Sequence, residues 1–122
     1  MKQKTLSLQS RISSFGFAFR GIFKFFQQEP NAWIHLAATS CVFIAAVYFD
    51  VSNSEMIALI IVSAFVWVAE IFNTVIERIM DFISVKKEPE IAFIKDLAAG
   101  AVLISAITAI FVGAIVFIPK LF

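Results

Sequence analysis

Three long apolar stretches constrain the fold of this 122-residue chain more than any other feature of its sequence. Each is long enough for a helix to cross the hydrocarbon layer of a bilayer, which is roughly 30 Å thick and takes about 20 residues. Hydrocarbon offers an open backbone no hydrogen-bond partners, so a segment that spans it must be helical. The sequence therefore predicts three transmembrane helices, over residues 30–49, 56–83 and 96–118.

The composition agrees with an all-α membrane protein. Apolar residues make up 61% of the chain and charged residues only 16%, whereas the surface of a soluble domain needs more charge. The chain has only three Pro and four Gly, which argues against a turn-rich β fold. We expect one integral membrane domain over residues 1–122, with no nucleic-acid partner.

Residues 7–28 differ from the three spans because basic residues interrupt their apolar pattern. Apolar side chains recur there at helical intervals, and most polar side chains fall elsewhere around the helix. A basic amphipathic helix with an aromatic face lies flat on a membrane surface. A signal peptide is the alternative, but Arg20 and Lys24 break its apolar part and no small-residue cleavage site follows.

The distribution of basic residues predicts the orientation. The segment before Glu29 has five basic residues and no acidic one, the 84–95 loop has three, and the 50–55 loop has none. Because basic loops stay in the cytoplasm, we expect the N-terminus and the 84–95 loop on the cytoplasmic side of a bacterial inner membrane. The basic residues counted are Lys2, Lys4, Arg11, Arg20, Lys24, Lys86, Lys87 and Lys95.

Polar residues form a stripe along the second predicted span. At 100° per residue, Glu70, Asn73, Glu77 and Asp81 fall within an arc of about 80°. Glu70 lies about 10 Å deeper in the membrane than Glu77, where a carboxylate is costly and is functional by default. A solvated helix end accounts for Arg78 and for Asp81, but not for Glu70 with Asn73.

The third predicted span begins with a matching polar set. Lys95 and Asp96 stand at about the depth of Glu77, and Glu29 stands at the same level at the foot of the first span. Carboxylates beside a Lys suit a phosphate-handling site, because Mg²⁺ binds through one or two carboxylates plus substrate phosphates. A deeper carboxylate such as Glu70 can take the proton of a lipid hydroxyl. The spacing of Gly16 and Gly21 is not a P-loop, since no Lys-Ser/Thr follows.

At this point the sequence resembles the small prokaryotic diacylglycerol kinase and undecaprenol kinase family of membrane lipid kinases. The stretch "EIFNTVIERIMD" resembles the family's E-x-x-N-(T/S)-x-I-E-x-x-x-D helix, and "AFIKDLAAGAVLI" resembles its K-D-x-x-(A/S)-A-A-V-L segment. The stretch "SFGFAFRGI" resembles the N-terminal surface helix of the family. The resemblance covers essentially the whole chain.

The resemblance implies a homotrimeric bundle whose active sites are shared between subunits and transfer the γ-phosphate of Mg-ATP to a lipid hydroxyl. Glu70 matches the proposed general base, with Asn73 as a further catalytic polar residue. Glu29 and Glu77 match the carboxylates that bind Mg²⁺. The remaining nucleotide-side residues that the resemblance implies are Phe17, Lys86, Lys87, Lys95 and Asp96.

Three positions depart from the family pattern. Phe17 stands where some members have a Tyr near the nucleotide, and Arg11 matches the family's N-terminal basic residue to within one position. His35 stands where the diacylglycerol-specific branch has a carboxylate, which favours the undecaprenol kinase branch. The family name favours diacylglycerol, converted to phosphatidic acid, so the two acceptors remain as alternatives.

Two other classes of function fit the sequence less well. A small ion or proton transporter would use Glu70 as a relay, but it would not need Lys95, Asp96 and Glu29 at one interfacial level. A non-catalytic membrane scaffold would not need the polar stripe. The sequence therefore favours a lipid kinase over both.

Overall fold

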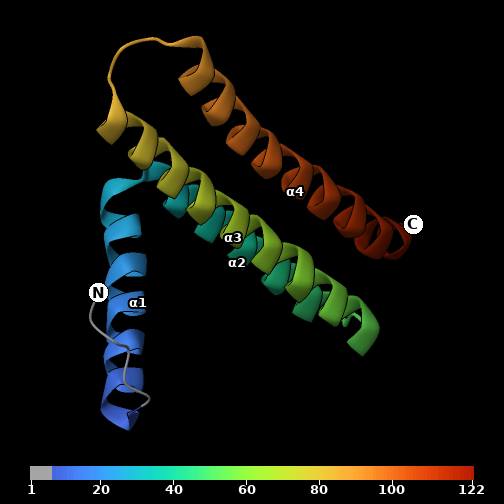
Figure 1. Cartoon of the computed structure of the whole chain (residues 1–122). Helices are drawn as coiled ribbons and strands as arrows, with labels where there is room; N and C mark the ends of the chain where they lie inside the picture. The colour runs from blue at the N-terminus through green and yellow to red at the C-terminus, as the bar shows by residue number, and fades with distance from the viewer. Residues whose placement is uncertain (1–6) are drawn as a thin grey trace. The chain divides into compact units, whose positions relative to one another are not determined.

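The computed structural model describes residues 7–122, which are helical apart from short connections (Figure 1). The helices of this part of the chain are α1 (Leu8–Gln28), α2 (Pro30–Tyr48), α3 (Asn53–Ile83) and α4 (Pro89–Leu121). The last three are each long and apolar enough to cross a membrane. The predicted fold class, an N-terminal helix followed by three spans, is confirmed. Lys2 and Lys4, which contributed to the predicted orientation, lie outside the described residues.

The contacts within the chain divide it into two compact units, one up to Ala37 and one over Ala38–Phe122. In the first unit, the Ser7 side chain caps α1 by accepting a hydrogen bond from the backbone N–H of Ser10 at 3.1 Å. At the other end of α1, the indole N–H of Trp33 donates to the carbonyl of Phe26 at 2.9 Å, and their rings pack edge to face. These contacts fix the turn between α1 and α2.

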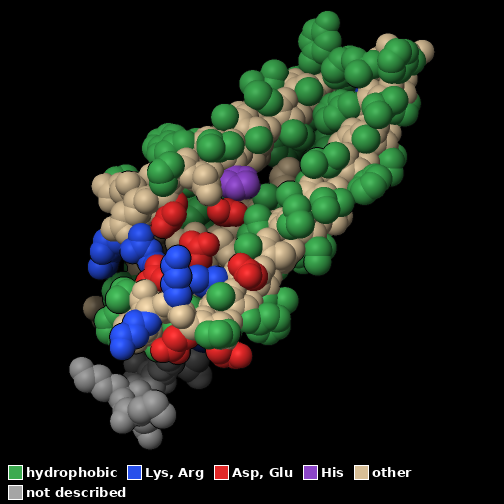
Figure 2. Space-filling model, turned by 90° about the horizontal axis from the view of Figure 1, so that it is seen from above, with side chains coloured by type: hydrophobic (Ala, Val, Ile, Leu, Met, Phe, Trp, Pro, Cys, Tyr) green, Lys and Arg blue, Asp and Glu red, His purple; other side chains and the backbone are tan. Residues whose placement is uncertain are grey.

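The second unit holds the polar stripe, and α3 and α4 form its main helix–helix contact. A capping box starts α3, in which the Ser52 hydroxyl and the Glu55 carboxylate each accept a backbone N–H of the other residue. At this end of the unit, Ala46, Leu59 and Val116 form a buried apolar cluster that joins α2, α3 and α4. Few other apolar side chains are buried. Figure 2 shows hydrophobic side chains, in green, over much of the visible surface. Such a surface suits a hydrocarbon solvent.

The start of α4 differs from the prediction. The helix begins at Pro89, seven residues before the predicted span, so the loop is residues 84–88 and the predicted 84–95 loop is wrong in its second half. Proline at the first helical position lacks only an N–H that would have no partner there, and its fixed φ suits a helix. Lys95 and Asp96 therefore lie on a helix.

Two other helix ends also extend past the predicted spans. The helix α4 continues through Pro119 to Leu121, because a proline in the last turn removes only one hydrogen bond. The helix α3 begins at Asn53 rather than Met56, because the capping box satisfies its first backbone N–H groups. Both extensions lengthen a helix beyond its apolar stretch.

Candidate functional site

The deepest carboxylate of the predicted stripe is buried. Glu70 is 6% exposed, and the only other buried polar side chain among residues 7–122 is Ser105, also 6% exposed. An ionisable side chain enclosed within a membrane-spanning helix is costly, which makes Glu70 a candidate functional residue. This burial agrees with the expectation that Glu70 faces a protein interior rather than lipid.

One turn further along α3, Asn73 and Glu77 form a hydrogen-bonded pair. The Asn73 amide donates from Nδ2 to Oε1 of Glu77 at 3.0 Å. The Asn73 carbonyl oxygen, Oδ1, is fully enclosed and has no hydrogen-bond partner. Buried polar atoms in proteins nearly always have a partner in the protein or in ordered water, so this oxygen has the capacity to accept one further hydrogen bond.

Two of the five predicted interfacial charges, Asp81 and Lys95, form an ion pair. The ammonium of Lys95, in the second turn of α4, contacts the carboxylate of Asp81 near the end of α3. Both side chains keep considerable contact with solvent, 35% exposed for Lys95 and 59% for Asp81. Asp96, the neighbour of Lys95, is exposed. The pair joins α3 and α4 next to their connection.

The short connection between α3 and α4 presents the two other predicted basic residues. Lys86 and Lys87 are exposed, and the backbone N–H of Lys86 donates to the Ser84 hydroxyl at 3.1 Å. This local bond shapes the turn and leaves both ammonium groups in solvent.

Two predicted site residues belong to the first unit and are described within it. Glu29 ends α1, with its backbone N–H donating to the Phe25 carbonyl at 2.9 Å, and its side chain is half-buried. The Phe17 ring lies 4.9 Å from the Arg20 guanidinium in a cation–π contact. The predicted metal pair of Glu29 and Glu77 stays a prediction.

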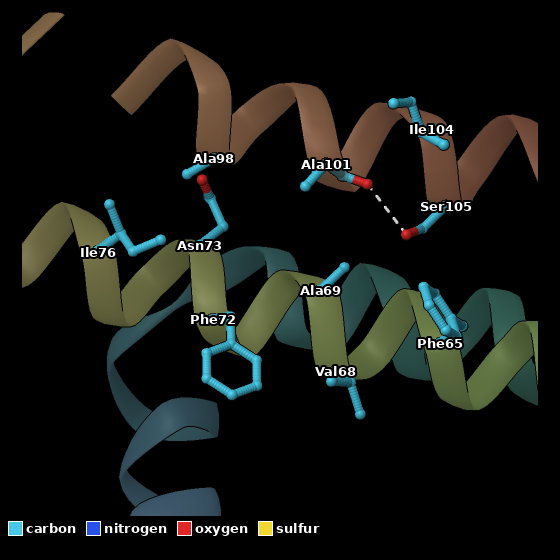
Figure 3. Close-up of a pocket in the computed structure, with 10 residues that line it drawn as sticks. All are labelled: Phe65, Val68, Ala69, Phe72, Asn73, Ile76, Ala98, Ala101, Ile104 and Ser105. Atoms are coloured by element: carbon cyan, nitrogen blue, oxygen red, sulfur yellow. Dashed lines mark hydrogen bonds between the residues drawn. The ribbon is translucent and has the colours of Figure 1, made fainter. Parts of the chain in front are cut away.

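A groove of about 380 Å³ lies between α3 and α4, and Figure 3 shows Asn73 extending from α3 toward α4 across it. Its walls are almost entirely apolar, and Asn73 and Ser105 are its polar residues. Glu70 does not line the groove, although it lies one helical turn from Asn73. The lining residues are Phe65, Val68, Ala69, Phe72, Asn73, Ile76, Ala98, Ala101, Ile104 and Ser105.

Sequence reasoning missed Ser105 and two polar contacts that hold the second unit together. Trp67 donates from its indole N–H to the Thr39 hydroxyl at 2.9 Å. At the end of the helices opposite Lys95, Lys120 forms an ion pair with Glu55 at 3.1 Å. The available signal for the contact between Trp67 and Thr39 was that each lies inside an apolar span and carries a polar group. Such groups usually hydrogen-bond between helices.

Comparisons with known proteins show the family of the chain. Residues 16–117 match the model of the prokaryotic diacylglycerol kinase family. The undecaprenol kinase of Bacillus subtilis (strain 168) is 34% identical over 108 residues, which are 88% of this chain and 88% of that protein. The diacylglycerol kinase of Synechocystis sp. is 34% identical over 109 residues, 88% of this chain and 62% of that longer protein. The family and both relatives indicate a lipid kinase. The chain belongs to the prokaryotic diacylglycerol kinase family.

Proposed function

We propose that this protein transfers the γ-phosphate of Mg-ATP to the hydroxyl of a membrane lipid, at the cytoplasmic face of a bacterial inner membrane. The observation that carries the proposal is the arrangement on α3. A buried carboxylate, Glu70, lies one turn from the hydrogen-bonded pair of Asn73 and Glu77. Membrane-spanning helices retain such groups for function, and the family supplies the chemistry.

Glu70 is the proposed general base. Its carboxylate would accept the proton of the lipid hydroxyl while the hydroxyl oxygen attacks the γ-phosphorus and the bond to the β-phosphate oxygen breaks. Its enclosure on α3 keeps bulk water from competing with the lipid for the phosphoryl group. Asn73 positions Glu77 through the amide hydrogen bond.

Glu77 and Glu29 are the proposed carboxylate ligands of Mg²⁺. Glu77 fits this role because the Asn73 amide fixes one of its oxygens, Oε1, and the other has no hydrogen-bond partner among the described residues. When bound, Mg²⁺ supplies neutralising charge to the phosphate oxygens. Within residues 7–122 no group of three or more His, Cys, Asp or Glu side chains gathers as a metal site. Magnesium sites commonly use one or two carboxylates plus substrate phosphates.

Lys95 is the proposed partner of the nucleotide phosphates. In the structure its ammonium is bound to Asp81, so nucleotide binding would exchange one anion for another. The exposed Lys86, Lys87 and Asp96 lie close to Lys95 in sequence and would contribute further nucleotide contacts. Phe17 would offer its ring to the nucleotide from the surface helix.

A homotrimer is the proposed assembly. The large number of exposed hydrophobic side chains on α3 and α4 leaves ample surface for both lipid and further copies of the chain. The proposed orientation places the exposed Lys86 and Lys87 in the cytoplasm, where ATP is available. Crosslinking in native vesicles followed by denaturing electrophoresis tests the trimer, and a ladder that stops at the dimer would contradict it.

The proposed acceptor is a lipid alcohol, with diacylglycerol and undecaprenol as the two candidates that the relatives suggest. The test is phosphate transfer from γ-labelled ATP to each acceptor by purified protein in lipid and detergent mixtures with Mg²⁺. We expect label in the lipid phase with at least one acceptor. Folded protein that labels neither acceptor, while an active family member does so in parallel, would overturn the proposal.

A further inference from the structure

The ion pairs at the two ends of α3 and α4 differ in how firmly they are held. The pair of Glu55 and Lys120 is mostly enclosed, and the backbone N–H of Ser52 also donates to the Glu55 carboxylate. The side chains of Asp81 and Lys95 are more exposed. Within residues 7–122 the Asp81 carboxylate has no partner besides Lys95. The pair of Asp81 and Lys95 is therefore the one that dissolved anions can reach.

This exposed pair adds little to the attachment of the two helices. The connection of residues 84–88 already tethers α3 to α4 at this end (Figure 1), and the bond from the Lys86 backbone N–H to the Ser84 hydroxyl shapes it. Exposed ion pairs contribute little to stability, because water screens both charges and long side chains lose freedom when they are fixed. An exposed pair of small structural value can exchange one partner for another.

Nucleotide phosphates and the Asp81 carboxylate compete for the same cation. The Lys95 ammonium has N–H donors and no acceptor, so it binds anions and favours those with the most charge. The basic residues of α4 are Lys95 and, at the opposite end of the helix, Lys120. At its cytoplasmic end in the proposed orientation, α4 thus has no second cation that could bind one anion while Lys95 binds the other.

We propose that Asp81 is a built-in competitor that sets the affinity of this protein for nucleotide. Its carboxylate holds the Lys95 ammonium when no nucleotide is bound, yields it to the phosphates when ATP binds, and takes it back as ADP leaves. Asp81 touches neither substrate and acts through Lys95 alone. This inference rests on the proposed kinase function and names a regulation of its nucleotide site.

The size of the effect follows from the strength of the pair. Only molecules whose Lys95 is released from Asp81 bind nucleotide at full strength, so the apparent Kd is the intrinsic Kd divided by the released fraction. An exposed ion pair of ordinary strength leaves between about a half and a sixth of the molecules released. Removing the charge of Asp81 should therefore tighten the binding of ATP and of ADP by about two- to sixfold. In the wild type, the same competition speeds the release of ADP.

The test is a double-mutant cycle measured by nucleotide binding. Asp81→Asn, Lys95→Met and the double variant are compared with the wild type in lipid and detergent mixtures with Mg²⁺. The probe is an ATP analogue with a fluorescent group on its ribose, and ADP is the competing ligand. Asp81→Glu keeps the charge and is the conservative variant. Glu90→Gln is the matched control, because it removes an exposed carboxylate of α4 that has no described contact with Lys95.

We expect Asp81→Asn to bind both nucleotides about two- to sixfold more tightly than the wild type and to lower the KM for ATP by the same factor, with the KM for the lipid unchanged. In the Lys95→Met background the same substitution should have no effect, because no ammonium is left to compete for. A merely structural role of Asp81 would not give this dependence on Lys95. Asp81→Glu and Glu90→Gln should bind as the wild type does.

The outcomes separate this inference from the proposed function. Unchanged or weaker binding by Asp81→Asn, an equal effect with and without Lys95, or an equal effect of Glu90→Gln would overturn the inference and leave the kinase function standing. Wild-type protein that binds no nucleotide would overturn both. Asp81→Ser, which also removes the charge, takes the place of Asp81→Asn in the cycle if that variant does not assemble.

Discussion

The side-chain amide of Asn73 donates to Oε1 of Glu77 at 3.0 Å, and this bond leaves the carbonyl oxygen of Asn73 enclosed and unpartnered. One asparagine therefore fixes a carboxylate with one end and presents an acceptor with the other. In the proposed reaction, Glu77 binds Mg²⁺ on the nucleotide side, and Asn73 joins it to the turn of α3 that carries Glu70, the proposed base. The proposed reaction brings the nucleotide and the lipid together at that place.

Replacing Asn73 is expected to affect both substrates. In Asn73→Ala, Glu77 loses its donor and the groove loses its acceptor, so kcat/KM should fall for the lipid and Mg²⁺ use should weaken, each by about 10–100-fold. Steady-state kinetics with each substrate varied in turn measure both effects. Asn53→Ala, at the exposed start of α3, is the control. A loss confined to one substrate would contradict the double role.

Replacing the buried carboxylate should remove the chemical step. Glu70→Gln keeps the size and the hydrogen-bonding capacity of the side chain but cannot accept a proton, so kcat should fall by roughly 10²–10⁴. Single-turnover phosphorylation of the lipid measures this loss, and size-exclusion chromatography checks that assembly is unchanged. Glu90→Gln, in the exposed first turn of α4, should retain wild-type turnover. A Glu70→Gln variant of normal turnover would remove Glu70 from the role of base.

Removing the charge of Glu77 should change the metal requirement. Glu77→Gln retains an oxygen that accepts from the Asn73 amide, so the local geometry is kept while one anionic ligand is lost. The Mg²⁺ concentration for half-maximal turnover should rise by about 10-fold or more. Titration of Mg²⁺ at saturating ATP measures the shift, and an unchanged titration curve would exclude Glu77 from the metal site.

The ion pair at the opposite end of the helices should support stability rather than catalysis. Lys120→Met leaves Glu55 without the ammonium that binds it at 3.1 Å, so the thermal midpoint in detergent should fall while turnover below that midpoint is kept. Lys120→Arg retains the charge and should restore most of the midpoint. If Lys120→Met melts as the wild type does, the contact makes no measurable contribution.

The helices and the stripe were predictable because they depend on local pattern. Apolar length sets the spans, and a repeat of 100° per residue places Glu70, Asn73 and Glu77 together without knowledge of any other helix. Helix ends were harder, since Pro89 looks like a break in the apolar pattern but serves as the first helical residue.

The groove was not predictable, because it depends on the rotation of α4 against α3. Ser105 is a polar residue in an apolar span, and the sequence around it does not indicate whether its side chain faces α3 or lipid. The pair of Glu55 and Lys120 joins residues 65 positions apart, and no periodicity relates them. Only packing decides such contacts.

The position of Lys95 on a continuous helix has a consequence for how the protein works. A basic residue on a flexible loop can swing over a nucleotide as part of a lid, but Lys95 is part of a 33-residue helix. Its reach is set by rotation about its own side-chain bonds or by displacement of α4 as a rod. In the proposed mechanism, the nucleotide phosphates must therefore approach a cation whose backbone position is fixed by α4.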